Sequence, residues 1–272
     1  MHPNLAKYLK EISEIYWKEI CALDINGKIE GDARKSIKTF ISGYAYERKG
    51  APKAYPEIAV EIIDLYFKDK IKNNDDATKY LEKRCEEKGI GPNRTNNIFY
   101  GGGKITILDF MDKINRISIE EWAKKCIEQE GISNTHREMC KIRGIGTKIA
   151  SFYIRDIVYK YSLENNAKNA EKRLLHPIDI WVRRSGKILL NDSGKTDSAI
   201  QKFLVGFAEE GGITNTELNA GLWVLGARIC KDKRRLESVI INTNIIKKMS
   251  RDRIKRNVIE IKALKKALES MD

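Results

Sequence analysis

Residues 139–157 read MCKIRGIGTKIASFYIRDI, and this stretch carries the clearest structural signal in the chain. Two glycines, Gly144 and Gly146, flank one aliphatic residue, a spacing that allows a tight turn through backbone conformations that other residues resist. Amphipathic patterns lie on both sides of the turn, and Ile145 would face back to hold the two helices together. The stretch therefore predicts a helix–hairpin–helix element at residues 134–158. The second helix should bury Ile149, Ala150, Tyr153, Ile154 and Ile157.

A turn of this kind exposes backbone N–H groups at the N-terminus of the following helix. Those donors and the helix dipole form a seat for a phosphate, so the element can hold a DNA backbone without reading its bases. We expect backbone contacts from Arg143, Gly144, Gly146 and Thr147, although Arg143 could equally pair with a nearby glutamate.

Helical patterning extends over nearly the whole chain. Ser118 opens one helix with a sequence typical of a capping box, and Gly131 ends it. The best strand candidate, residues 236–246, could equally be the end of a helix, and the polar residues 162–173 should form a surface loop.

We therefore predict an all-α fold of two helical lobes with a DNA cleft between them. Residues 1–40 and 180–272 would form the terminal lobe, and residues 41–179 the central lobe with the hairpin.

The charge balance favours a polyanionic partner. The 272 residues hold 51 Lys and Arg against 38 Asp and Glu, a formal net charge of +13. This surplus points first to nucleic acid, although a lysine-rich surface can also serve solubility alone. Ten Lys and Arg against four acids fall between Lys231 and Glu260, the pattern of a phosphate-contacting face or of a solvated helix. Neither a bilayer-spanning apolar run nor a secretory signal is present, so no membrane is expected.

The five cysteines are widely spaced, odd in number and without a CxxC pair. This usage argues against a disulfide framework, a zinc ribbon and an iron–sulfur cluster, so no metal and no other cofactor is expected. We expect buried thiols at Cys21, Cys126 and Cys140, and an intracellular compartment such as the cytoplasm or nucleoid.

Residues 176–184, HPIDIWVRR, form the second distinctive segment. Pro177 sets an extended approach, and Asp179 stands where a new helix begins. Taken alone, an aspartate at such a position most often caps the helix.

Together, RGIGTKIA at residues 143–150 and HPIDIWVR at residues 176–183 resemble the helix–hairpin–helix DNA glycosylase superfamily. On that match Lys148 falls on the family's lyase lysine, and Asp179 falls on its catalytic aspartate. The segment LWVLGARIC at residues 222–230 resembles the family's final core helix. Members like endonuclease III continue from that helix into four clustered cysteines, which this chain lacks.

Within the superfamily the hairpin looks most like that of the archaeal 8-oxoguanine DNA glycosylases, and the 31-residue interval from Lys148 to Asp179 is similar to that branch. The resemblance implies a monomeric, bifunctional glycosylase and AP lyase that removes an oxidised purine, 8-oxoguanine, from damaged double-stranded DNA. Two alternatives stay open. One is a glycosylase for an oxidised or deaminated pyrimidine, and the other is a non-catalytic protein that uses the hairpin as a DNA clamp.

The chemistry explains why these residue types are needed. Cleavage of an N-glycosidic bond builds positive charge on the sugar, and a carboxylate such as that of Asp179 stabilises this charge. A neutral amine can attack the same carbon to give a Schiff base and then β-elimination, so Lys148 must lose its proton. Its helix N-terminus and an expected partial burial both favour the neutral form. Asp179 could accept that proton, although its charge alone would keep the lysine protonated.

The remaining candidates follow from the resemblance. Tyr44, Tyr46 and Arg48 lie in an early loop where the superfamily places base-pocket and wedge residues, and aromatic or cationic side chains can fill a vacated base stack. Surface or packing roles suit the two tyrosines at least as well. His176 would lie near the site beside Asp179, or would cap a turn.

Overall fold

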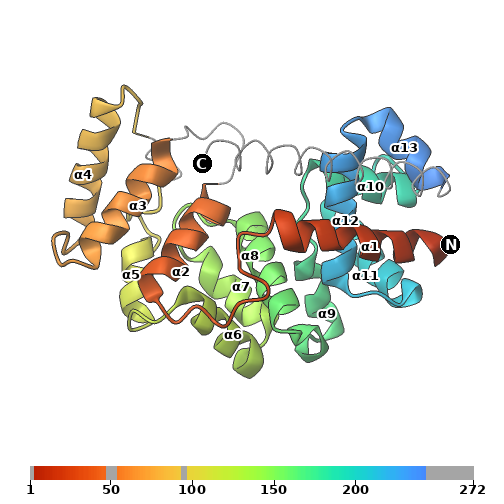
Figure 1. The fold of residues 1–272 in the computed structure, drawn as a ribbon, viewed down its shortest axis with the longest axis horizontal. Coiled ribbons are helices and arrows are strands. Elements are labelled where there is room, and N and C mark those ends of the chain that lie inside the picture. Colours follow the sequence, from red (N-terminus) through yellow and green to blue (C-terminus); the bar gives the residue numbers. More distant parts are fainter. Residues whose placement is uncertain (1–2, 47–53, 93–96, 243–272) are drawn as a thin grey trace, which may run out of the picture. The chain divides into compact units, whose positions relative to one another are not determined.

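A computed structural model describes residues 3–46, 54–92 and 97–242. Within these ranges the chain is all-α, as predicted: it contains thirteen α-helices and four short 3-10 or π-helical segments, and no strand. The chain divides into two compact units, which we call the terminal unit (Met1–Glu19 with Ile178–Asp272) and the central unit (Ile20–Pro177). Figure 1 labels their helices.

The break between the units differs from the predicted boundary at 40/41. It falls between Glu19 and Ile20, because α2 (Ala33–Phe40) buries Ile37 and Phe40 in the core of the central unit. The second break falls at Pro177/Ile178, two residues before the predicted one.

The terminal unit is built on α1 (Pro3–Glu19), which packs along α12 (Asn215–Val224) (Figure 1). Gly221 permits this close approach, since a Cβ atom there would lie 2.2 Å from the Leu9 carbonyl oxygen. The other elements of this unit are α10 (Ile180–Leu189), α11 (Asp197–Gly211), a π-helical segment (Leu225–Cys230) and α13 (Lys233–Ile241).

In the central unit, α8 (Thr147–Lys160) contributes Ala150, Tyr153, Ile154, Ile157 and Val158 to the hydrophobic core. As predicted, α6 (Ile119–Glu130) begins after Ser118, whose hydroxyl accepts the Glu121 N–H, and ends at Gly131. The remaining helices are α3 (Ala54–Tyr66), α4 (Asn74–Glu87), α5 (Ile107–Lys113), α7 (Ile132–Cys140) and α9 (Asn169–Lys172), and a π-helical segment (Ile41–Ala45) follows α2.

Three regions differ from expectation or lie outside the description. The strand candidate at 236–246 is helical up to Ile241, and its last residues lie outside the described ranges. Most of the basic residues between Lys231 and Glu260 also lie outside these ranges. The segment 162–173 forms short helical turns. Across the described ranges, no helix is both long and apolar enough to cross a membrane.

Candidate functional site

The hairpin turn joins the end of α7 at Cys140 to the start of α8 at Thr147. Gly144 has a φ of +76°, in the left-handed region that side chains with a Cβ atom rarely adopt. Gly146 has φ −97° and ψ 175°, an extended conformation that is open to any residue. The predicted need for a special backbone conformation therefore holds for Gly144 and not for Gly146.

The turn is fastened to the core of the central unit. Ile142 and Ile145 are both buried, and Ile145 is only 1% exposed, so it holds the turn as predicted. The Arg143 N–H donates to the Ile105 carbonyl at 2.8 Å, in an isolated parallel bridge between the segments. The path of the backbone is thus set before any ligand binds.

The Arg143 side chain binds a neighbouring glycine loop. Its Nη1 atom donates to the carbonyl oxygens of Gly101 at 2.7 Å and of Gly102 at 3.3 Å. Lys104 ends the loop and donates from Nζ to the Cys140 carbonyl at 3.3 Å. Arg143 therefore binds residues 101–102, a partner that no local sequence pattern indicates.

The N-terminus of α8 is open. Gly146, Thr147 and Lys148 are all exposed, and a Cβ atom built at Gly146 would meet no heavy atom within 4 Å. No side chain in the described part of the chain caps this helix. First-turn N–H groups without a cap are suited to bind an anion.

Lys148 is the second residue of α8, and its side chain is exposed, so the expected partial burial is wrong. Its Nζ atom lies 5.7 Å from the centre of the Phe152 ring, one helical turn further along. No described residue of the central unit forms a hydrogen bond or ion pair with this amine. The amine is therefore open to solvent beside the uncapped N-terminus of α8.

His136 is a residue near Lys148 that sequence reasoning missed. Its Nε2 atom lies 3.2 Å from the Thr147 carbonyl oxygen, and its Nδ1 atom lies 3.8 Å from Cys140 Sγ. Burial lowers the pKa of His136, against a smaller opposing effect of the Thr147 carbonyl, and burial raises the pKa of the half-buried Cys140 thiol. The two neutral side chains therefore join the end of α7 to the start of α8. The four-residue spacing of His136 and Cys140 was the sequence signal that could have identified this pair.

Asp179 belongs to the terminal unit and caps α10. Its Oδ1 atom accepts the N–H of Trp181 at 2.9 Å and that of Val182 at 2.8 Å. The side chain is buried, with 8% exposure. The capping interpretation is confirmed, and any catalytic role has to be compatible with it.

The two tyrosines proposed for a base pocket lie in the core of the central unit. Tyr44 is 6% exposed, and its hydroxyl donates to Asp156 Oδ2 at 2.8 Å. Tyr46 is also buried and stacks on Tyr55, with ring centres 6.1 Å apart. The packing interpretation therefore suits both. Arg48 lies outside the described residues.

His176 is fully buried at the end of a 3-10 turn (Arg173–Leu175), and its N–H donates to the Arg173 carbonyl at 3.1 Å. It therefore closes this turn, which was the second of the two roles expected for it.

A buried polar network occupies the middle of α8. Arg155 Nε donates to Asp156 Oδ1 at 2.8 Å, and its Nη2 atom forms an ion pair with the same oxygen at 2.7 Å; neither side chain is exposed. Asp156 Oδ2 accepts Tyr44 and also the Cys21 thiol, at 3.4 Å. Burial, and next the Asp156 charge, raise the pKa of Cys21, so the thiol stays protonated.

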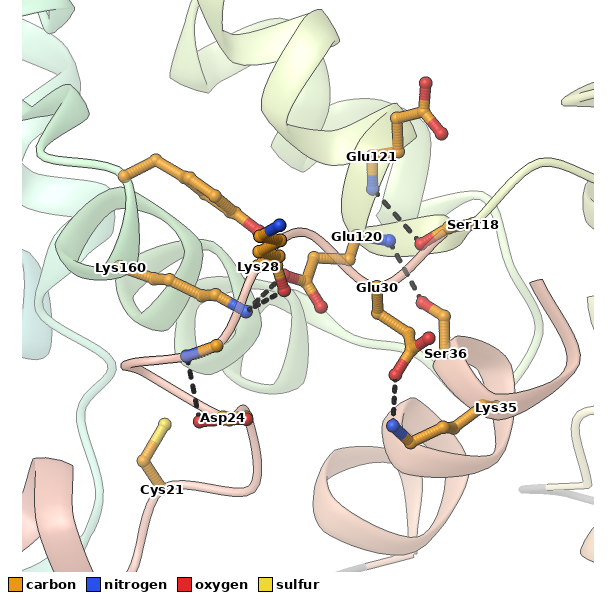
Figure 2. A network of polar contacts seen from close by, with 12 residues as sticks. Cys21, Asp24, Lys28, Glu30, Lys35, Ser36, Ser118, Glu120, Glu121 and Lys160 are labelled. Carbon is orange, nitrogen blue, oxygen red and sulfur yellow. Dashed lines mark hydrogen bonds and ion pairs between the residues drawn. The ribbon is translucent and has the colours of Figure 1, made fainter. Parts of the chain in front are cut away.

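A second polar cluster lies at the other end of α8, beside a cavity of about 360 Å³. Figure 2 shows Lys160 between Glu120, at 2.6 Å, and the Lys28 carbonyl, at 3.4 Å, while the Glu120 N–H donates to Ser36. Lys160 follows Lys148 by twelve residues, or about 18 Å along a helix. This cavity is therefore out of reach of a lysine at position 148.

Comparison with family models, with curated proteins and with solved structures found no match to this chain. The described residues contain no group of three or more His, Cys, Asp or Glu side chains that could hold a metal ion. The functional argument therefore depends on the sequence segments and on the geometry of the hairpin.

Proposed function

We propose that the protein is a bifunctional DNA glycosylase and AP lyase that removes 8-oxoguanine from duplex DNA. One observation carries the proposal: the exposed Lys148 amine lies at a helix N-terminus that no described side chain caps, directly after a glycine turn fastened to the core. The resemblance of residues 143–150 and 176–183 to the superfamily supports the assignment of the chemistry.

The phosphate contacts would come mainly from the backbone. No described side chain caps the first N–H groups of α8, and a Cβ atom built at Gly146 would meet no heavy atom within 4 Å, so this helix start suits a phosphate oxygen. Arg143 holds the glycine loop, so its contribution is to keep the turn in shape. The net charge of +13 would then govern affinity and its salt dependence.

The proposed reaction begins when the damaged nucleotide leaves the base stack. The neutral Lys148 amine forms a bond to C1′ of the sugar, while the N-glycosidic bond breaks and its electron pair leaves with the base, which takes up a proton. The Asp179 carboxylate stabilises the positive charge on the sugar. The amine then loses a proton, and the C1′–O4′ bond breaks to open the sugar ring, with O4′ taking up a proton. Loss of a proton from C2′ of the resulting iminium then expels the 3′ phosphate by β-elimination.

Borohydride trapping tests this proposal directly. Duplexes that each contain one 8-oxoguanine, thymine glycol, uracil or no lesion are incubated with the protein and sodium borohydride. We expect a covalent protein–DNA adduct with the 8-oxoguanine duplex, and its loss in Lys148→Gln. Lys83→Gln is the matched control, because Lys83 is an exposed lysine on α4, remote in sequence from the hairpin.

The outcomes separate the alternatives. An adduct with the thymine glycol or uracil duplex instead identifies a glycosylase for another lesion. Duplex binding without an adduct on any substrate identifies a non-catalytic clamp. An adduct that survives Lys148→Gln shows that a different amine does the chemistry.

A further inference from the structure

Phe152 lies on α8 one turn after Lys148, and two cations lie near its ring. The Lys148 Nζ atom is 5.7 Å from the ring centre, and the Arg155 Cζ atom is 5.0 Å from it. The electron-rich face of an aromatic ring attracts a cation at such distances. The four-residue spacing also brings Lys148 and Phe152 onto one face of the helix.

The two cations differ in mobility. Arg155 is fully buried and is held by two contacts to Asp156, which in turn accepts Tyr44. Lys148 is exposed, at the start of the helix. The half-buried ring of Phe152 thus has two cations near it within the central unit, one buried and paired with Asp156 and one exposed on a four-carbon side chain.

We propose that Phe152 is a positioning residue for the Lys148 amine, and that the Arg155–Asp156 pair holds the Phe152 ring in place. This inference rests on the proposed function, in which Lys148 is the nucleophile. A lysine side chain loses much rotamer freedom when it is fixed for attack. If the ring already restricts the Lys148 side chain in the free protein, less rotamer freedom remains to be lost in the reaction step.

The first test measures the rate of adduct formation. A duplex with a preformed abasic site is used at saturation, so that base release is not required. We expect Phe152→Leu and Phe152→Met to slow borohydride-trapped adduct formation about tenfold. In these variants the unrestrained Lys148 side chain must be ordered at each attack. Affinity for a duplex with a tetrahydrofuran abasic analogue should stay unchanged, since the ring acts on the amine and not on the phosphates.

Two controls accompany these variants. Phe152→Tyr keeps an aromatic face and should restore the rate. Phe203→Leu makes the same substitution at another half-buried helical phenylalanine, on α11, and should leave the rate as in the parent protein. A thermal melt of each variant shows that it is folded.

The second test needs no DNA. Trace acetic anhydride acetylates neutral amines, and mass spectrometry reports the yield at Lys148 relative to Lys83. The ring restrains the Lys148 side chain and limits the orientations in which its amine meets the reagent, so Phe152→Leu should raise acetylation of Lys148 about two- to fivefold. Phe152→Tyr should not.

The inference requires both changes. Unchanged acetylation, or unchanged trapping by Phe152→Leu in a protein that does form the adduct, overturns it. If the parent protein forms no adduct with any duplex, the proposed function fails, and acetylation alone then decides whether the ring restrains the amine.

Discussion

Two substitutions separate the capping role of Asp179 from its proposed catalytic role. Asp179→Asn keeps an oxygen that can accept the Trp181 and Val182 N–H groups, whereas Asp179→Ala removes it. Loss of an N-cap costs about 1 kcal/mol, and asparagine caps as well as aspartate does. Loss of the negative charge at the helix N-terminus costs a further ~0.5 kcal/mol in either variant. We therefore expect destabilisation of about 1.5 kcal/mol for Ala and about 0.5 kcal/mol for Asn.

The activity should follow a different order. If the carboxylate stabilises positive charge on the sugar, both variants lose it completely, and base release should fall by about 10²–10³ in each. For a chain of this size, each kcal/mol of destabilisation lowers the melting temperature by about 2–4 °C. The Asp179→Asn variant should therefore melt within about 2 °C of the parent protein. Single-turnover release of 8-oxoguanine, with protein in excess over duplex, gives the rate, and a thermal melt gives the stability.

Asp232 supplies the matched control. It caps α13 in the same unit, and its Oδ1 atom accepts the Arg234 and Arg235 N–H groups. Asp232→Asn and Asp232→Ala should leave base release unchanged. If Asp179→Asn keeps the parent rate while Asp179→Ala loses it in step with stability, Asp179 is a cap and the reasoning is refuted.

Three further predictions concern the central unit. Gly144→Ala should destabilise the protein by about 1–2 kcal/mol, because an alanine there must adopt a left-handed backbone conformation. The unfolding free energy of Gly146→Ala should stay close to that of the parent protein, and equal urea midpoints for the two variants would contradict this. Tyr44→Phe removes a donor to the buried Asp156 carboxylate and should lower the unfolding free energy by about 1–3 kcal/mol, which the same urea titration measures. The pKa of His136 is lowered on folding, so its contribution to stability is present above pH ~6.5 and is lost as the pH falls. Melting temperatures from about pH 7.5 to 5.5 should therefore fall less in His136→Gln than in the parent, and parallel curves would refute the assignment.

The sequence predicted the features that local physics determines. Helical periodicity indicated an all-α chain, and the glycine pair indicated a turn in which one of its two members, Gly144, has a positive φ. Of the five residues expected to form the buried stripe of α8, four are buried and Ile149 is half-buried. These signals lie within one or two helical turns, where side-chain spacing alone decides which face is apolar.

Features that depend on long-range packing could not be predicted in this way. Arg143 binds a carbonyl 42 residues away, and Tyr44 binds a carboxylate 112 residues away. Neither partner leaves a local pattern. The amphipathic face of α2 likewise shows that it packs on a core but not which core, so the predicted boundary at 40/41 differs from the break at Glu19/Ile20. The exposure of Lys148 depends in the same way on what covers the hairpin.

The contrast between two helix starts leads to a last prediction. Asp179 closes the start of α10 with its own carboxylate, whereas the start of α8 has no described side-chain cap. A carboxylate that already accepts two of the first N–H groups competes with a phosphate for them, so DNA should bind at α8 and not at α10. Gly146 has an extended backbone with open space around a Cβ atom, and Gly146→Asp would therefore supply the missing cap. We expect this variant to melt at a higher temperature than Gly146→Ala and to bind duplex at least about tenfold more weakly, because the new carboxylate occupies and repels the phosphate site. Fluorescence anisotropy with a labelled duplex measures the affinity, and equal affinities of the two variants would show that the phosphate does not bind at this helix start.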